Sequence, residues 1–407
     1  MSRDDVAAGR REASGTGRVS RRLAFPLVGY AFAVTMLGTT LPTPLYPLYQ
    51  HNIGFSGFMV TVIFAVYAIG VVGALLCFGQ LSDQIGRRRA LIPGLLLSAL
   101  SAVVFLTAGG LPALFIGRVL SGLSAGIFTG TATAALVDFA PEGRRGRATL
   151  VATLVNVGGL GLGPLLAGLL AEYAPLPLRL PFIVDLALLV PALIAVIVIP
   201  EPVDVRGGVR IRLQRLRVPP EVRSVFVPAA FVGFAGFAVL GLFTAVAPAF
   251  LGQVLQLPNH ALTGVVVFAV FAASAVGQLA LGLFPGRIAL PVGSLALIVG
   301  IGIVAVGLGV ESLALLLIGG IVAGLGQGLS FRAGLTAITG GTPANRRAEV
   351  TSSFFVVLYV ALAVPVIGVG LAAQGIGLRS AGIAFAGVVA ALAAVTLVMQ
   401  RRQTAAA

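Results

Sequence analysis

The sequence has no tryptophan, no lysine and a single cysteine, and only 10% of its 407 residues are charged. A soluble domain carries about 25% charged residues, so this scarcity argues against a water-soluble protein. The lone Cys77 excludes an internal disulfide, and because it lies in an apolar run we expect a buried structural thiol. Since lysine is absent, all 27 basic residues are arginines.

Groups that could carry chemistry are equally scarce. The two histidines, His51 and His260, fall in separate loops without neighbours at metal-ligand spacing, and no phosphate-binding Walker sequence occurs. We therefore expect no enzyme activity, no metal site and no cofactor.

Apolar sequence dominates the chain. Apolar residues make up 58% of it, and the mean hydropathy is +1.06. A helix of about 20 apolar residues crosses a ~30 Å hydrocarbon core, and the alternating pattern of membrane strands is absent. The sequence thus predicts an all-α polytopic membrane protein. Twelve transmembrane helices are expected, over residues 24–48, 57–79, 90–108, 112–137, 149–171, 180–199, 224–250, 262–284, 288–308, 312–335, 349–373 and 379–399.

The arginines outside these spans fall almost entirely on one side of them. The other side holds only Arg179 and Arg379. Because cytoplasmic loops are rich in basic residues, we predict that both termini are cytoplasmic, in a plasma membrane such as a bacterial inner membrane. The net charge of +14 then reflects this bias and attraction to anionic lipid, and no nucleic-acid partner is expected.

The chain repeats itself at a nearly constant offset. Residues 28–31 (VGYA) align with 232–235 (VGFA), and Pro44 aligns with Pro248. Such an internal repeat predicts two pseudo-symmetric six-helix bundles. The expected organisation is a cytoplasmic tail (1–22), a first bundle (23–199), a basic linker (200–223) that is either solvated or lies on anionic lipid, a second bundle (224–399) and a short cytoplasmic tail (400–407).

A charged loop follows the second span, and its residues fit the pattern Gly-x-Leu-x-Asp-x-x-Gly-Arg-Arg. With two six-helix halves around it, this loop resembles the signature of the major facilitator superfamily, over essentially the whole chain. The resemblance implies a latch on the cytoplasmic side, in which Asp83 pairs with Arg87 or binds a helix N-terminus in the opposite half. Arg87 would relay to Asp138. The alternative is that the charges only set orientation. The predicted gate residues are Gly79, Asp83, Gly86, Arg87, Arg88 and Asp138.

Arg118 lies well inside the fourth span. An arginine within the membrane is costly and normally serves a pathway or a specific partner. Its repeat mate is Gly320, so the duplicated scaffold does not require it. The family resemblance implies that Arg118, with Gly122, takes part in proton transfer.

The fifth span combines small residues with a proline. Small residues let helices approach closely, and the run is similar to a motif of the drug:proton antiporter branch of the family. Ala167 stands where that branch usually has glycine, and simple packing is the alternative explanation. The motif residues are Gly159, Gly163, Pro164 and Gly168.

Asp185 is the one acid that falls convincingly within a span. Buried there without a partner, it could carry a proton at neutral pH; alternatively it reaches the outer interface near Arg179. The first span has no acid, although many antiporter relatives carry one there.

The resemblance places a substrate cavity between the halves at the membrane midplane. Few charges and several aromatic residues favour a small hydrophobic solute over a sugar. We expect proton-coupled efflux of such compounds by alternating access, with no required protein partner; uptake of a small metabolite with protons is the alternative. The candidate lining residues are Tyr30, Phe32, Tyr67, Phe234, Phe243, Gln327 and Phe331.

Overall fold

A computed structural model describes residues 19–78, 81–141, 143–203, 214, 216–343 and 346–406. Every regular element among them is helical, and twelve helices are long and apolar enough to cross a membrane. The all-α prediction is therefore confirmed. The elements are α2 (Arg21–Thr40), η1 (Thr43–Leu45), α3 (Tyr46–Ile53), α4 (Gly57–Phe78), α5 (Leu81–Ile85), α6 (Arg87–Leu106), α7 (Leu111–Phe139), α8 (Arg145–Tyr173), α9 (Leu180–Val198), α10 (Pro220–Ala245), α11 (Ala247–Ala249), the π-helical turn η2 (Phe250–Val254), α12 (His260–Leu279), η3 (Ala280–Leu283), α13 (Gly286–Gly309), α14 (Leu313–Gly341), α15 (Arg347–Ile376) and α16 (Leu378–Ala406).

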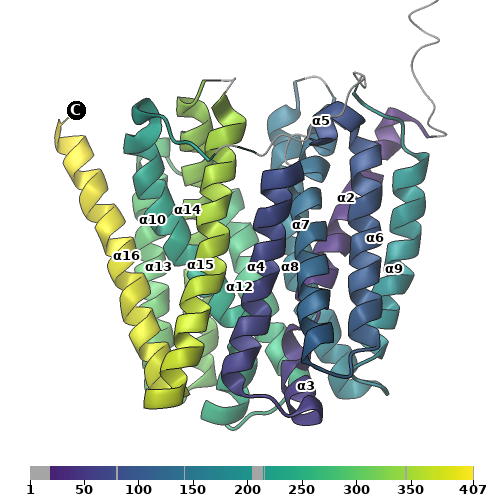
Figure 1. Ribbon diagram of the computed structural model, residues 1–407. Coiled ribbons are helices and arrows are strands. Elements are labelled where there is room, and N and C mark those ends of the chain that lie inside the picture. Colours follow the sequence, from purple (N-terminus) through teal and green to yellow (C-terminus); the bar gives the residue numbers. More distant parts are fainter. Residues whose placement is uncertain are drawn as a thin grey trace, which may run out of the picture.

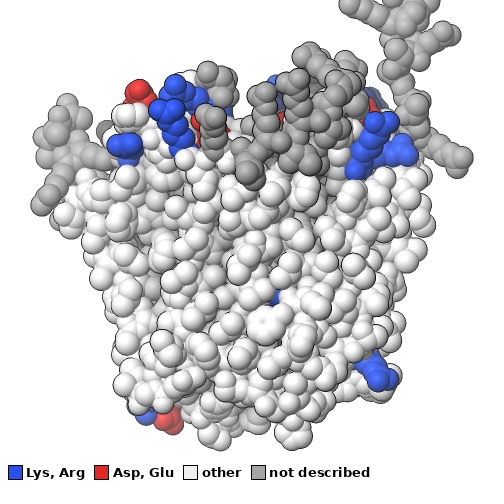
Figure 2. Space-filling model, in the orientation of Figure 1, with Lys and Arg blue, Asp and Glu red and all other residues white. Residues whose placement is uncertain are grey.

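Both ends of the described chain lie on one side of the helix bundle, together with α5, whereas α3 lies on the other (Figure 1). We call these the terminal side and the far side. Charged side chains gather at the rims of the molecule, and the broad band between them is almost entirely uncharged (Figure 2). Large apolar side chains such as Leu100, Ile116 and Val306 are exposed along this band, as a surface facing lipid requires.

The first and seventh predicted spans are interrupted at matching positions. Pro44 lies in η1 directly after α2, and its repeat mate Pro248 lies in α11 directly after α10. A proline lacks the backbone N–H that would continue the helical ladder, so each long span ends in short helical turns on the far side. The helix α16 continues to Ala406, beyond the predicted end at 399.

Glycines bring neighbouring helices into backbone contact within each half. In the first half, a Cβ added to Gly126 of α7 would lie 2.6 Å from the Ala74 Cβ and 2.8 Å from the Val71 carbonyl oxygen of α4. In the second half, Gly328 of α14 lies in the same way against Ser274 of α12. The duplicated glycines therefore set the same helix spacing in both halves.

Contacts between the halves run mainly along two helix pairs, α4 with α15 and α8 with α12. Further contacts join η1 to α12 and α3 to α11, and α3 lies on the far side (Figure 1). The halves are therefore held together at their far ends in this conformation.

The packing at Gly126 can be tested by adding one methyl group. Gly126→Ala should lower the free energy of unfolding by about 1–3 kcal/mol, since a well-packed contact must open to admit the new atom. Chemical unfolding in mixed micelles measures this. Gly130→Ala, on the same helix but with no atom within 4 Å of the added Cβ, should be neutral or slightly stabilising. Equal effects of the two substitutions would contradict the packing argument.

Candidate functional site

The charged loop on the terminal side turns sharply between α5 and α6. Gly86 forms the turn with a φ of +100°, in the left-handed region that favours glycine. A Cβ at this position would also collide with the carboxylate of Glu201. Both observations explain why the turn needs glycine. Gly79, the first residue of the predicted motif, lies outside the described residues.

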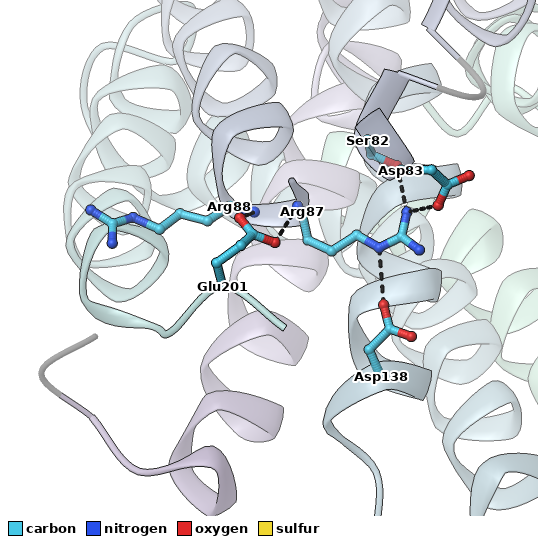
Figure 3. Close-up of polar contacts among 6 residues, drawn as sticks. All are labelled: Ser82, Asp83, Arg87, Arg88, Asp138 and Glu201. Carbon is cyan, nitrogen blue, oxygen red and sulfur yellow. Dashed lines mark hydrogen bonds and ion pairs between the residues drawn. The ribbon is translucent and has the colours of Figure 1, made fainter. Parts of the chain in front are cut away.

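Arg87 is the centre of a cluster of polar side chains in the first half (Figure 3). Its Nη1 atom lies 2.5 Å from Asp83 Oδ1 and donates to Ser82 Oγ at 2.7 Å. Its Nε atom donates to Asp138 Oδ2 at 3.0 Å. The arginine is 8% exposed, while the Asp83 side chain is 61% exposed. The structure thus brings together the three residues of the predicted relay.

Glu201 completes this cluster from a segment that the sequence indicates only as linker. Its two carboxylate oxygens accept the backbone N–H groups of Arg87 at 2.6 Å and Arg88 at 3.1 Å (Figure 3). The first N–H groups of a helix have no partner within the helix, and a negative charge is favoured there. Glu201 therefore caps α6 from 114 residues away, while the Arg88 side chain points away from Asp83.

The described side-chain partners of Arg87 and Asp83 come from the first half. The prediction left two alternatives for Asp83, and in this conformation it takes the pairing with Arg87. Within the described residues, its ion pair is with Arg87 and not with the second half.

Arg118 is 1% exposed and lies deep in the first half. Its Nε atom donates to the Tyr46 hydroxyl at 2.7 Å, Nη2 donates to the same hydroxyl, and Nη1 donates to the Thr39 carbonyl at 2.6 Å. The guanidinium also lies over the rings of Phe64 and Phe105, at 5.8 and 5.9 Å. Neutral groups alone therefore satisfy this charge among the described residues.

The break after α2 supplies one of these acceptors. The last four carbonyls of a helix lack partners within the helix, and Thr39 stands in the last turn of α2. Arg118 binds a carbonyl of this kind. Gly122, one turn further along α7, lies against the backbone of Tyr67 and Gly70 in α4.

Asp185 of α9 is 2% exposed and points into the first half. Its carboxylate lies against Gly38 of α2, where an added Cβ would be 2.8 Å from Oδ2, and Oδ1 has no hydrogen-bond partner. Of the two alternatives for this acid, the structure favours burial, because Arg179 is exposed and forms no ion pair with it. Asp185 and Arg118 thus contact adjacent residues of α2.

The small residues of the fifth span lie on two faces of α8. On one face, Gly159 and Gly163 lie against α2, at the Ala33 and Leu37 carbonyls. On the other face, Pro164 and Gly168 lie against α12 of the second half, where Gly264 faces Pro164 and His260 faces Gly168. The helix is therefore packed closely both within its own half and across the boundary between the halves.

Most of the aromatic residues predicted to line a cavity lie in packed cores. Phe32 belongs to the core of the first half, Phe331 stacks with neighbouring phenylalanines, and Phe234 is half-buried on α10. Phe243 lies in the core of the second half with its ring against Gly320, the repeat mate of Arg118.

The remaining candidates make polar or cross-half contacts. The Tyr30 hydroxyl donates to the Leu188 carbonyl at 3.0 Å. Gln327 accepts from Ser274 Oγ at 2.5 Å within the second half. Tyr67 meets Tyr359 of the second half edge to face, with ring centroids 6.4 Å apart.

A polar contact joins the halves on the far side. Two of its residues, Glu172 and His260, lie outside the predicted spans, and Pro44 lies in the first span. The backbone N–H of His260 donates to Glu172 Oε2 at 2.8 Å, and its Nδ1 lies 3.0 Å from the Pro44 carbonyl. Glu172 and Pro44 belong to the first half and His260 begins α12. No local pattern indicates this contact, because its partners are distant in sequence.

Comparisons with known proteins agree on the class of protein. The sequence profile described as Major Facilitator Superfamily matches residues 28–364. The chain is 28% identical over 146 residues to the quinolone resistance protein NorA of Staphylococcus aureus, which covers 36% of this chain and 37% of that protein. It is 27% identical over 202 residues to multidrug resistance protein 1 of Bacillus subtilis, covering 49% and 50%. These matches span half or less of each relative.

Similarity of fold extends over nearly the whole chain. The crystal structure of a POT family transporter, in complex with a thioalcohol-conjugated peptide, superposes with a TM-score of 0.75 and 13% identity. It covers 94% of this chain and 96% of that one. At this identity the likeness concerns the fold.

The cap on α6 predicts a local loss of protection. Glu201→Ala should make the amides of the first turn of α6 exchange with solvent about tenfold to a hundredfold faster, because hydrogen bonds to a charged group contribute about 1.5–3 kcal/mol. Hydrogen exchange followed by mass spectrometry measures this. Glu221→Ala, at an exposed acid in the first turn of α10, is the matched control. Unchanged exchange in α6, or the same change in both variants, would rule out the cap.

Proposed function

The chain belongs to the major facilitator superfamily, and on that premise we propose that it exports small, mainly hydrophobic compounds in exchange for protons by alternating access. In such a cycle the two halves rock about a central site, so that contacts on one side form while those on the other break. The terminal side is the cytoplasmic side in this proposal.

The position of the α8 motif is the observation that carries the proposal. Its glycines and Pro164 form a close helix contact with α2 on one face and with α12 on the other. A shift of α8 would therefore be felt in both halves, since neither contact has room to yield. The glycine spacing in this helix is similar to that of the motif found in the antiporter branch. The names of both curated relatives refer to drug resistance.

Two polar clusters fit the roles of gates. On the terminal side, Arg87 ties α5, α6 and α7 together and Glu201 fixes the start of α6. On the far side, His260 connects α12 to Glu172 and Pro44 of the first half. The described contacts of His260 hold the halves together on the far side, whereas the described side-chain partners of Arg87 lie in the first half.

Asp185 is the proposed proton carrier. It is buried, one of its oxygens lacks a partner, and it packs on the same turn of α2 that Arg118 binds. Gain or loss of its proton would change the charge beside Gly38, and a charge change in an apolar interior is felt strongly by its neighbours. The Arg118 guanidinium binds the carbonyl of Thr39, the residue that follows Gly38 in α2.

Vesicles with an imposed pH gradient test the direction of transport. In vesicles with an acidic interior, a hydrophobic compound from a drug-like panel should accumulate as protons leave, which a pH-sensitive dye reports. Movement of compound and protons in the same direction would overturn export and favour uptake. A panel in which no compound moves protons would also overturn the proposal.

Substitution of the buried acid tests the coupling. Asp185→Asn should abolish accumulation driven by the pH gradient while sparing exchange of labelled for unlabelled compound, because only the former requires a proton to be carried. Glu311→Gln, at an exposed acid paired with Arg379 on the far side, is the control and should behave as the parent protein. Full gradient-driven transport by Asp185→Asn would remove this residue from the mechanism.

Substitution in the terminal cluster tests the gate. Asp83→Asn should slow transport about tenfold or more while insertion, orientation and thermal stability remain nearly unchanged, because Asp83 is exposed and Arg87 keeps Asp138 and Ser82 as partners. Transport rates at equal protein density measure the effect. A variant with full activity would show that the loop charges serve orientation alone.

A further inference from the structure

A cavity of about 480 Å³ lies on the far side, between the two halves. The first half lines it with residues of α3 and the start of α4, and the second half lines it with the ends of α10 and α15 and with η2 (lower end of these helices in Figure 1). Its volume is within the range of small-molecule sites, about 300–1,000 Å³. None of the predicted cavity residues lines it.

Three glutamines give this cavity its side-chain amides: Gln50 from the first half, and Gln253 and Gln374 from the second. We call it the glutamine cavity. Their side-chain amides have no hydrogen-bond partner within the described residues, so each can both donate and accept a bond to a ligand. The hydroxyls of Tyr46, Ser56 and Thr61 also lie in the cavity wall, and each already has a partner within the protein. Apolar surfaces such as Phe58 and Pro248 form the rest of the wall.

The cavity wall contains no charged side chain among the described residues. An ion that enters this cavity finds no counter-charge in its wall to replace the hydration it gives up. An uncharged molecule with amide or hydroxyl groups on an apolar body can hydrogen-bond to the glutamines and also pack against the apolar part of the wall. The lining therefore selects for a neutral amphiphile.

The cavity is connected to the buried arginine and to the boundary between the halves. Tyr46 forms part of its wall, and the hydroxyl of Tyr46 accepts from Arg118 Nε at 2.7 Å. Thr61 of α4 and Gly370 of α15 are in contact within the same wall. A molecule in the cavity would touch both halves and favour the state in which the far ends stay together.

We propose that the glutamine cavity binds a small uncharged amphiphile and that its occupancy holds the far side closed. Binding itself is independent of the proposed transport function, whereas the effect on transport rests on it. A ligand that binds only the state with a closed far side holds protein molecules in that state. Fewer of them then complete the transport cycle, so transport slows.

The absence of tryptophan makes the binding measurable. Phe58→Trp introduces one fluorophore at the cavity wall, and octyl glucoside below its micellar concentration is the neutral probe, with the protein in lipid nanodiscs. We expect a saturable fluorescence change. Octyl sulfate, with the same tail and a negative charge, should bind at least tenfold more weakly. Phe284→Trp, between η3 and α13 on the terminal side, reports any change that comes from the lipid alone.

Two further variants, both in the Phe58→Trp background, separate a specific site from general partitioning. Gln50→Leu with Gln374→Leu should weaken binding of octyl glucoside roughly twentyfold, since each amide hydrogen bond contributes about a factor of five. Gly252→Leu places a side chain in the cavity, where an added Cβ has no atom nearer than 4.0 Å. It should abolish the fluorescence change with an unaltered thermal unfolding temperature.

Several outcomes would overturn the site: a non-saturable signal, equal responses at Phe58→Trp and Phe284→Trp, equal binding of octyl sulfate, or binding unaffected by the substitutions. The effect on transport is measured in a separate assay. Octyl glucoside should inhibit gradient-driven transport by the parent protein, and this inhibition should be relieved in Gly252→Leu. Saturable binding without inhibition would retain the site and reject its effect on the far gate. Failure of all transport would contradict the proposed function and leave the binding result standing.

Discussion

A charged group inside the apolar band must find its partners within the protein, because hydrocarbon supplies none. This constraint shapes the first half. Arg118 is satisfied by a tyrosine hydroxyl, a carbonyl at the end of a broken helix and the faces of two phenylalanines. Asp185 is less fully satisfied, with one oxygen unpartnered. In the second half, Ser274 and Gln327 form a buried contact between neutral side chains, and Arg332 of α14 is only half-buried. The fully buried charges described here therefore lie in the first half.

The frame itself depends on close helix contacts. Glycines at equivalent positions set α7 against α4 and α14 against α12, and α8 is held by glycines on both of its faces. Contacts of this kind leave little room for gradual deformation, so we expect each half to move as a body in the proposed cycle, with change confined to the boundary between them. At that boundary the far side carries direct links through His260, whereas the described contacts of Arg87 and Glu201 are internal to the first half. The two sides are therefore built differently.

Composition and periodicity predicted the twelve helices, because an apolar run of the right length has one stable form in lipid. The offset repeat aligned Pro44 with Pro248, and the structure breaks the helix near both residues, inside spans that were predicted as continuous. The motif spacing also placed Arg87 near Asp83 and Asp138. Glu201, Glu172 and the glutamine cavity could not be predicted in this way. Their partners are far apart in the chain, and a capping acid, a helix-end acid or a surface glutamine carries no local pattern that distinguishes it from any other loop residue.

The contact between Phe243 and Gly320 in the second half is the counterpart of the contact between Thr39 and Arg118 in the first. Phe243 is the repeat mate of Thr39, and Gly320 is the repeat mate of Arg118. In the first half, the long side chain of Arg118 reaches the backbone of Thr39. In the second half, the ring of Phe243 packs against Gly320, which has no side chain. An arginine at 320 would collide with the ring, and a glycine at 118 would leave a void beside Thr39. The two positions of each pair are therefore complementary in size, and a change of size at one of them calls for a compensating change at the other.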